Sequence, residues 1–291
     1  MSLHQKVRAV ARGARGWLFV PSVGNRPPVK SDASPPIGRW HPHFGEISGL
    51  RLEEWLGRFP ESPAIRRSLL LATEERTGSE WLCQMLGALG RLGRPSEYLN
   101  TGWMRKFIED YPEDVARQVE IARRAGTTEN GIFATKLHTQ HLDRLLQADR
   151  LTTAFPKPAF VRLSRRDRLG QAISAVRAYQ THAFHAHWDK SAAECYDAQA
   201  IHHMLKNLIQ LSTRWTLYFS RNGIEPLQLY YEDLQQDPRG SLLKIAQHVG
   251  VELESGHPHL QAPPLAVQRD AVSLDWRARF VSELGDLDIF E

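Results

Sequence analysis

Short apolar runs alternate with longer segments of helical periodicity along most of this chain. Four runs have the length and composition of buried strands, and they lie at residues 68–73, 131–137, 159–164 and 227–231. The segments between them are long enough for helical crossovers, so the strands are expected to be parallel. The pattern predicts an α/β fold, a three-layer sandwich with a central parallel sheet, in which ligands bind at the carboxyl ends of the strands.

Three helices are indicated by apolar residues spaced three and four positions apart. Their buried faces are expected to contain three sets of residues: Trp81, Leu82, Met85, Leu86 and Leu89; Leu169, Ala172, Ile173 and Val176; and Ile201, Leu205, Leu208, Trp215 and Phe219. Gly223 and Gly250 follow the third of these helices and a further helix near residues 242–249, so they are expected to end those helices.

The first 63 residues have a different character. Proline, glycine and histidine are frequent from residue 21 onward, and no period is sustained apart from a short helical patch at residues 50–56. Residues 1–20 carry four basic side chains, Lys6, Arg8, Arg12 and Arg15. We interpret them as a solvated basic arm, with peripheral membrane contact as the alternative. The sequence thus predicts an irregular N-terminal extension, residues 1–63, followed by one domain, residues 64–291.

Charge and cysteine content narrow the classes of function. The formal net charge is +4, which favours anionic ligands. Outside the N-terminus the arginines are dispersed among acidic residues, so we expect no nucleic acid partner. Cys83 and Cys195 lack metal-ligand and C-x-x-C spacing, which indicates reduced thiols and a cytoplasmic protein. The sequence contains no run of about 18 apolar residues, so we expect no transmembrane helix. Any contact with the inner membrane face would then be peripheral.

The first predicted strand ends in a turn that is suited to bind an anion. Residues 74–79 read E-E-R-T-G-S and precede a helix that is expected to begin near Glu80. A helix N-terminus presents unpaired N–H groups and a partial positive charge, Gly78 permits close approach of the backbone, and Arg76 adds a fork of donors. An ordinary strand-to-helix turn has the same local character, so the motif alone leaves both interpretations open.

The third predicted strand ends in a basic bend. Arg165 and Arg166 follow it directly, and Ser174 lies on the next predicted helix. An arginine at a strand end and a serine hydroxyl can together bind a phosphate group. The alternative is that these arginines form a solvated face with neighbouring acids.

Both bends resemble segments of a known enzyme family. Residues 71–82, L-A-T-E-E-R-T-G-S-E-W-L, are similar to the 5′-phosphosulfate loop of sulfotransferases that use PAPS (3′-phosphoadenosine-5′-phosphosulfate). More narrowly, they resemble the R-S-G-S-T-L-L loop of the bacterial trehalose 2-sulfotransferase family. Residues 165–181, from R-R-D to A-Y-Q-T, are similar to that family's R-P-D-V-V-S-Q-A-V-S-F-W-R-A-V-Q-T segment.

The resemblance implies roles for particular residues. It assigns the 5′-phosphosulfate to the first turn, through Arg76, Thr77, Gly78 and Ser79. It assigns the 3′-phosphate to Arg165 and Ser174, with Arg166 as the rival because other sulfotransferases place the serine eight residues after the arginine. Glu80 departs from the family, which has a threonine there, and we expect the glutamate to turn away from the donor and favour the helix dipole.

Sulfuryl transfer to a hydroxyl needs a group that accepts the hydroxyl proton. Glu97 lies in a segment similar to the family's G-x-x-G-E-P-Q-E-F, which carries the proposed general base at the matching position. His138 ends the second predicted strand in a K-L-H segment that resembles the K-T-H pattern of cytosolic sulfotransferases. We favour Glu97 and keep His138 as the alternative. Lys136 is expected either to approach the bridging oxygen or to pair with an acid.

The C-terminal part and the acceptor side are less defined. Residues 265–276 resemble the family's Q-x-D…W segment that folds over the donor, so Gln268 and Trp276 are candidate donor ligands. Five aromatic and imidazole side chains suit stacking on a sugar ring or a lipid edge: His182, Phe184, His185, His187 and Trp188. They have no evident second shell, and we predict no metal.

Together these features predict a sulfotransferase with a P-loop-like sulfotransferase fold. It would move a sulfuryl group in line from PAPS to a hydroxyl of a carbohydrate or glycolipid, with Arg76 holding developing charge and Glu97 or His138 as the base. The family also suggests a homodimer. A kinase-like nucleotide-dependent transferase is one alternative, although the pattern G-x-x-x-x-G-K-[ST] is absent from the sequence. A non-catalytic nucleotide-binding or glycolipid-binding protein is the other.

Overall fold

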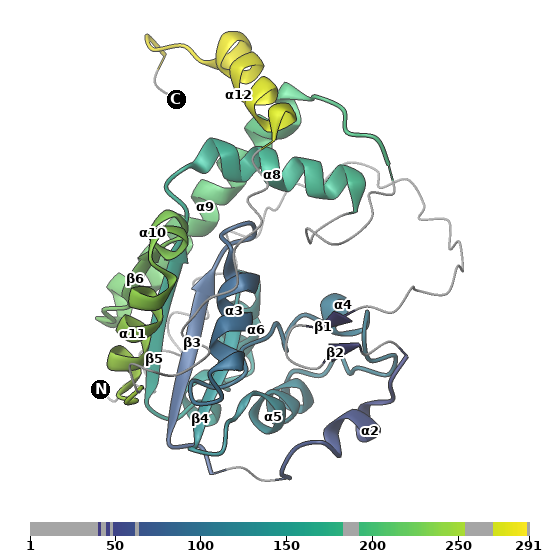
Figure 1. Cartoon of the computed structure of the whole chain (residues 1–291), viewed down its shortest axis with the longest axis vertical. Coiled ribbons are helices and arrows are strands. Elements are labelled where there is room, and N and C mark those ends of the chain that lie inside the picture. Colours follow the sequence, from purple (N-terminus) through teal and green to yellow (C-terminus); the bar gives the residue numbers. More distant parts are fainter. Residues whose placement is uncertain are drawn as a thin grey trace.

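A four-stranded parallel sheet forms the centre of the molecule (Figure 1). The computed structural model describes residues 40–41, 45–46, 49–61, 64–182, 192–253 and 270–289. The sheet has the order β4-β3-β5-β6, and its strands are β3 (Arg67–Thr73), β4 (Ile132–Leu137), β5 (Pro158–Ser164) and β6 (Leu227–Tyr230). Each strand agrees with its predicted run to within one residue at either end. The predicted α/β fold with a central parallel sheet is confirmed.

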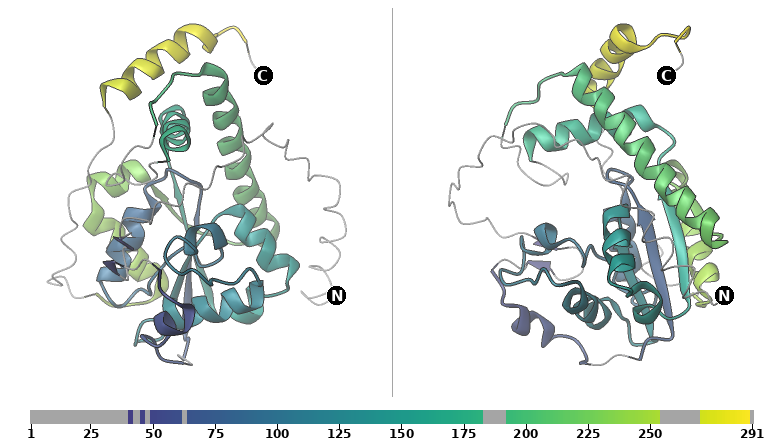
Figure 2. Two further views of the ribbon diagram at one scale, coloured as in Figure 1. Left: turned by 90° about the vertical axis from the view of Figure 1, so that its right-hand side faces the viewer. Right: turned by 180° about the vertical axis from the view of Figure 1, so that it is seen from behind.

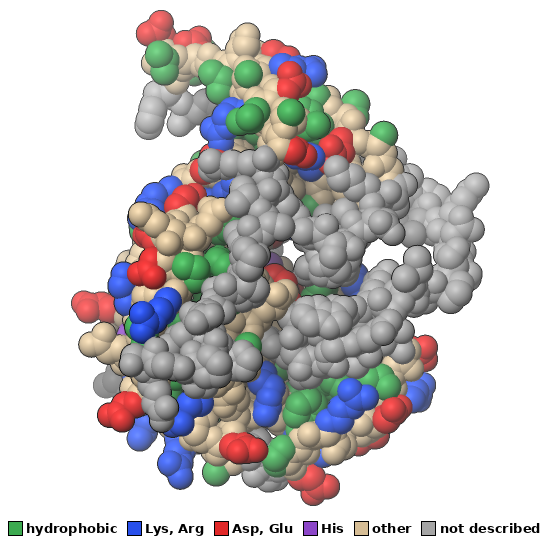
Figure 3. Space-filling view, in the orientation of Figure 1, with side chains coloured by type: hydrophobic (Ala, Val, Ile, Leu, Met, Phe, Trp, Pro, Cys, Tyr) green, Lys and Arg blue, Asp and Glu red, His purple; other side chains and the backbone are tan. Residues whose placement is uncertain are grey.

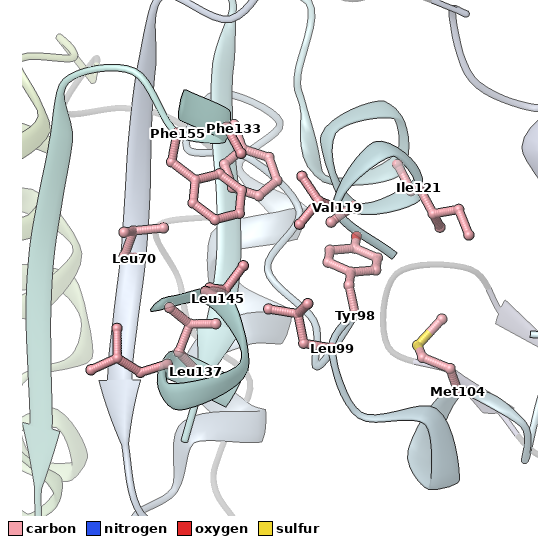
Figure 4. Close-up of a cluster of buried hydrophobic side chains, with 14 of the residues drawn as sticks. Leu70, Tyr98, Leu99, Met104, Val119, Ile121, Phe133, Leu137, Leu145 and Phe155 are labelled. Atoms are coloured by element: carbon pink, nitrogen blue, oxygen red, sulfur yellow. The ribbon is translucent and has the colours of Figure 1, made fainter. Parts of the chain in front are cut away.

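Helices cover both faces of this sheet, as the two views in Figure 2 show. Leu69 and Leu71 of β3 pack with helices α3 (Ser79–Ala88), α10 (Tyr231–Gln236) and α11 (Pro238–Val249). Leu70 and Ala72, whose side chains alternate with these, face α5 (Val115–Gly126), α6 (Thr139–Gln147), α7 (Leu151–Ala154) and α9 (Ala198–Asn222). Figure 4 shows part of the second cluster, in which Phe133 and Phe155 stack at a ring separation of 5.0 Å. Both faces of β3 are therefore buried.

A third apolar cluster lies beyond the carboxyl ends of the strands. It joins α8 (Arg168–Thr181), α9 and the C-terminal helix α12 (Ala271–Leu284), with Trp276 and Phe280 of α12 buried in it. Gly223 and Gly250 adopt left-handed conformations after α9 and α11, so the predicted helix ends are confirmed. Tyr231 begins α10 and does not end the strand before it.

The part of the N-terminal region that the structure describes contributes to the main core. A two-stranded antiparallel pair is formed by β1 (Trp40–His41) and β2 (Gly45–Glu46). Trp55, in the short helix α2 (Leu52–Leu56), is fully buried in the cluster that contains α5, and the short helix α4 (Thr101–Met104) supplies a further core residue, Met104. The division of the chain at residue 63 stays a prediction.

Charge on the surface is dispersed. In the described part of the face drawn in Figure 3, lysine and arginine side chains are interspersed with aspartate and glutamate. The described segments also contain no helix that is both long and apolar enough to cross a membrane.

A buried ion pair lies directly beneath the first turn. Glu74 follows β3 with a fully buried side chain, and its carboxylate pairs with the guanidinium of Arg162 in β5. Arg162 also donates to the carbonyl of Ala72 at 3.1 Å and to Ser212 of α9 at 3.2 Å, while Arg168 lies 3.7 Å from the same carboxylate. Because these charges are removed from water, each depends on the other for its compensation. The pair therefore fixes how the end of β3 sits against β5.

We expect Glu74→Gln to lower the free energy of unfolding by about 3–5 kcal/mol, because it leaves the Arg162 charge buried without its counter-ion. Urea denaturation at neutral pH measures this. The matched control is Glu120→Gln, which removes one partner of an exposed pair with Arg117 and should change stability by less than about 0.5 kcal/mol. A loss in Glu74→Gln as small as that of the control would contradict the role given to the buried pair.

Candidate active site

The first turn is tightly wound and closely packed. Arg76 and Gly78 both adopt left-handed backbone conformations, with φ of 59° and 75°. A Cβ atom on Gly78 would lie 2.5 Å from the ring of Tyr231, so only glycine fits there. The Thr77 hydroxyl donates to the carbonyl of Glu74 at 3.0 Å, and α3 begins at Ser79. A strained, glycine-dependent turn at a helix N-terminus is an arrangement typical of anion sites.

The basic bend after β5 lies directly beside this turn. Arg76 Nε donates to Ser174 Oγ of α8 at 2.9 Å, and Arg165 Nη1 donates to the carbonyl of Arg76 at 3.5 Å. Gln171 Nε2 donates to the carbonyl of Glu75 at 2.7 Å. Three side chains of the second segment thus contact the first turn. The structure brings Arg76, Arg165 and Ser174 together, as the sequence predicts.

Arg166 points to a different partner. Its guanidinium forms two hydrogen bonds with the Asp233 carboxylate, at 2.6 and 2.7 Å, and lies 4.1 Å from the centre of the Tyr230 ring. This side chain is half exposed, whereas that of Arg165 is buried. Of the two rival arginines, Arg165 is the one that lies against the first turn.

The C-terminal helix is tied to the same bend by charged pairs that the sequence analysis did not find. Asp167 caps α8 through the N–H of Gly170 at 2.9 Å, and its carboxylate also pairs with Arg277 of α12. Asp270, which caps α12, accepts two hydrogen bonds from Arg177 of α8. An aspartate after two arginines is visible in the sequence, but nothing there connects it to a residue more than one hundred positions later.

Of the other predicted donor-side and acceptor-side residues, the structure describes Trp276 and His182. Gln268 lies outside the described residues, and so do Phe184, His185, His187 and Trp188. His182 ends α8 in a left-handed conformation, and its contact with an acceptor stays a prediction. Trp276 is buried, with its ring 5.8 Å from that of Tyr196. Its contact with the donor stays a prediction. Among the residues that the structure describes, no group of three or more histidine, cysteine, aspartate or glutamate side chains could hold a metal ion.

A cluster of acids and bases lies next to the first turn. Lys136, near the end of β4, is buried, and its ammonium lies 2.7 Å from Glu97 Oε1 and 3.6 Å from Glu80 Oε2. The loop that carries Glu97 is held along β4, because Lys136 N donates to the carbonyl of Ser96 at 3.0 Å. Asn100 donates to the second oxygen of Glu97 at 2.6 Å. Glu80 therefore faces this cluster, a contact that the sequence did not predict. Its orientation relative to a bound donor stays a prediction.

His138 joins the cluster from the end of β4. Its Nε2 atom is buried and lies 3.9 Å from Glu97 Oε1, without a hydrogen-bond partner in the described part of the chain. The backbone N–H of His138 donates to Nδ1 of the His141 ring at 3.3 Å. Burial lowers the pKa of His138, against the opposing effect of Glu97, and burial with the nearby His138 lowers the pKa of His141 to about 3. Both imidazoles are neutral at neutral pH.

The same charges act on Glu97. Burial alone would raise the pKa of this carboxyl, but Lys136 outweighs it and brings the pKa well below its usual range; the two histidines add to this, less strongly, in the acid range where they are protonated. Conversely, burial would lower the pKa of Lys136, and Glu97 together with Glu80 raises it. Glu97 is therefore an ionised carboxylate held by a permanent ammonium. Such a carboxylate can receive a proton from a bound hydroxyl only if its attraction to the lysine ammonium is weakened or divided with another acid.

Comparison with known proteins gives a consistent result. A family model described as Stf0 sulphotransferase matches residues 68–283. A trehalose 2-sulfotransferase of Mycobacterium tuberculosis is 28% identical over 270 residues, covering 78% of this chain and 99% of that protein. A trehalose 2-sulfotransferase of Mycolicibacterium smegmatis is 26% identical over 255 residues, covering 72% of this chain and 93% of that protein.

One solved structure, a sulfotransferase domain from the curacin biosynthetic pathway, is a more distant match. It is 18% identical with a TM-score of 0.40, and the match covers 69% of this chain and 77% of that one. A similarity at this level carries no inference about the site.

We expect Gly78→Ala to destabilise the protein more than Gly223→Ala, which serves as its matched control. Both glycines have positive φ, but a Cβ on Gly223 would meet nothing within 4 Å. Both variants should lose about 1 kcal/mol through backbone strain, and Gly78→Ala about 1–3 kcal/mol more through the clash with Tyr231. Urea denaturation measures the difference, which should disappear in a Tyr231→Ala background. Equal losses in the two variants would show that the turn does not need the close approach.

Proposed function

The chain belongs to the Stf0 sulphotransferase family, and we propose that it transfers a sulfuryl group from PAPS to a hydroxyl of a carbohydrate, free or part of a glycolipid. One observation supports this most: two arginine-bearing bends from adjacent strands lie in contact, with Arg76 bonded to Ser174 and Arg165 against the backbone of Arg76. PAPS differs from ATP in having anionic groups at both its 3′ and 5′ positions. Two neighbouring anion sites are what such a molecule requires.

The residues present fit this donor. At the first turn, Gly78 brings the backbone of the α3 N-terminus close to a bound group, and Arg76 supplies a charged fork beside it. At the second bend, Arg165 and the Ser174 hydroxyl supply donors for a phosphate. In PAPS the bridging oxygen between phosphate and sulfuryl leaves as part of 3′,5′-bisphosphorylated adenosine, which is the chemistry that the donor brings.

Glu97 is the residue that we propose as the general base. It is ionised, it is oriented by Lys136 and Asn100, and it lies in the same cluster as Glu80 of α3. As the new S–O bond forms, the hydroxyl proton of the acceptor moves to a Glu97 oxygen, while Arg76 and the helix N-terminus hold the negative charge that develops on the donor side. His138, neutral and 3.9 Å away, is the alternative acceptor of that proton.

Isotope transfer tests the proposal. Purified protein is incubated with PAPS carrying radioactive sulfur and a panel of trehalose, other sugars and glycolipids, with EDTA present. The proposal predicts a labelled acceptor. Phosphorylated acceptor from labelled ATP, abolished by EDTA, would instead identify a kinase-like transferase. Binding of PAPS with no product from any acceptor would identify a non-catalytic binding protein.

We expect Glu97→Gln to reduce turnover at least about a hundredfold, which is the usual scale for the loss of a general base. Affinity for PAPS should stay nearly unchanged, because Glu97 acts on the acceptor. Steady-state kinetics and calorimetry measure the two quantities. His138→Gln should reduce turnover less. Wild-type turnover in Glu97→Gln would move the role of base to His138.

Two further features of the proposal concern partners. We infer from the family a homodimer and from the cysteine spacing a cytoplasmic protein. For the basic N-terminal segment we propose a solvated arm, with peripheral contact at the inner membrane face as the alternative. Light scattering and flotation with anionic liposomes test them.

A further inference from the structure

In the segment that resembles the family's phosphosulfate loop, Glu80 is the departure that introduces a charge; Thr77 and Trp81 stand where that loop has serine and leucine. The family has a threonine in place of Glu80, whereas this chain has a carboxylate at the second position of α3. Its side chain, about one-quarter exposed, lies 3.6 Å from the ammonium of Lys136, and the same ammonium contacts Glu97. The departure is therefore built into the acid and base cluster and is not an isolated surface substitution.

Lys136 is the link between the two carboxylates. It is buried, and its ammonium has a short contact with Glu97 and a longer one with Glu80, at 2.7 and 3.6 Å. One ammonium between two acids divides its attraction between them. The second carboxylate also repels the first, which makes proton uptake on either of them more favourable.

Dividing the attraction of Lys136 between two acids matters for the proposed proton transfer to Glu97. A general base works best when its pKa lies near the operating pH, and a carboxylate in an undivided ion pair with a buried lysine is far below it. In a site with threonine at this position, nothing on α3 would compete for the ammonium. Glu80 provides that competition here.

We propose that Glu80 is a positioning residue for sulfuryl transfer: its carboxylate shares the Lys136 ammonium with Glu97 and so keeps Glu97 able to take up the acceptor proton. The inference rests on the proposed function, in which Glu97 is the base. It adds a residue that does not touch the donor or the acceptor but acts through Lys136. It also accounts for the carboxylate in a turn that otherwise favours anions.

Charged and titratable groups face Glu97 from four elements. They are Lys136 and His138 from β4 and its end, His141 from α6, Glu80 and Cys83 from α3, and Glu75 from the first turn. Burial raises the pKa of Glu80, Lys136 opposes this, and Glu97 adds to it. Among these two carboxyls it is the pKa of Glu80 that this repulsion raises. Because the repulsion between two like charges is mutual, an ionised Glu80 also favours proton uptake on Glu97.

The test compares Glu80→Gln with the wild type across pH. Removing the charge leaves Lys136 to Glu97 alone, which lowers the pKa of Glu97. The kcat should therefore fall about tenfold throughout the neutral range, because a weaker base accepts the proton less readily. KM for PAPS should change less than about twofold. Glu80→Asp should restore part of kcat, and the exposed Glu120→Gln should match the wild type.

Two outcomes would overturn the inference. Superimposable profiles of Glu80→Gln and wild type would mean that the charge does not reach Glu97. A change confined to KM for PAPS would mean that Glu80 acts on the donor.

A second measurement is independent of turnover. The side-chain ammonium resonance of Lys136, in protein with labelled lysine and assigned by its absence in Lys136→Arg, should shift in Glu80→Gln and not in Glu120→Gln. An unshifted resonance would overturn the shared contact even in a protein that transfers nothing. A shifted resonance in a protein without any sulfuryl transfer would support the shared contact and contradict the proposed function.

Discussion

The contact between the end of β3 and the end of β5 is the constraint on which the rest of the site depends. The two strands are neighbours in register, with Thr73 opposite Leu163, so their carboxyl ends meet at one edge of the sheet. Beneath that edge the buried Glu74–Arg162 pair fixes their relative position, and above it Arg76 bonds to Ser174. Replacing a buried pair by apolar side chains often costs no stability. We therefore see its value here in alignment, because two anion sites must match one ligand.

A second constraint comes from the buried ammonium of Lys136. Burial of a charge is unfavourable unless it is paired, and here Glu97 and Glu80 supply the pairing from two different segments. The lysine thus holds the loop that carries Glu97 close to the N-terminus of α3. The contact that positions Glu97, the proposed base, also weakens it as a proton acceptor. The way that charge is divided between the two acids then matters as much as their positions.

The strands, the parallel sheet and the proximity of Arg76 to Arg165 could be predicted from the sequence. Buried strands have a strong apolar signature, and parallel strands gather their carboxyl ends by necessity. The cluster around Lys136 was not predictable in the same way. Glu80 has the ordinary character of an acid in a first helical turn, and only the folded structure shows that it reaches Lys136 of β4. The pairing of Arg277 with Asp167 joins segments that are far apart in the sequence, and no motif indicates it. The same is true of the packing of Trp55 in the main core.

The two bends, as proposed, bind opposite ends of one adenosine compound. Isothermal titration of 3′,5′-bisphosphorylated adenosine and of adenosine 5′-phosphate, with wild type, Arg165→Ala and Arg166→Ala, tests it most directly. We predict that wild type and Arg166→Ala prefer the bisphosphate at least about tenfold, the scale of one charge-assisted hydrogen bond, and that Arg165→Ala loses this preference. Equal affinity of the wild type for the two compounds, or no binding of either, would contradict the account.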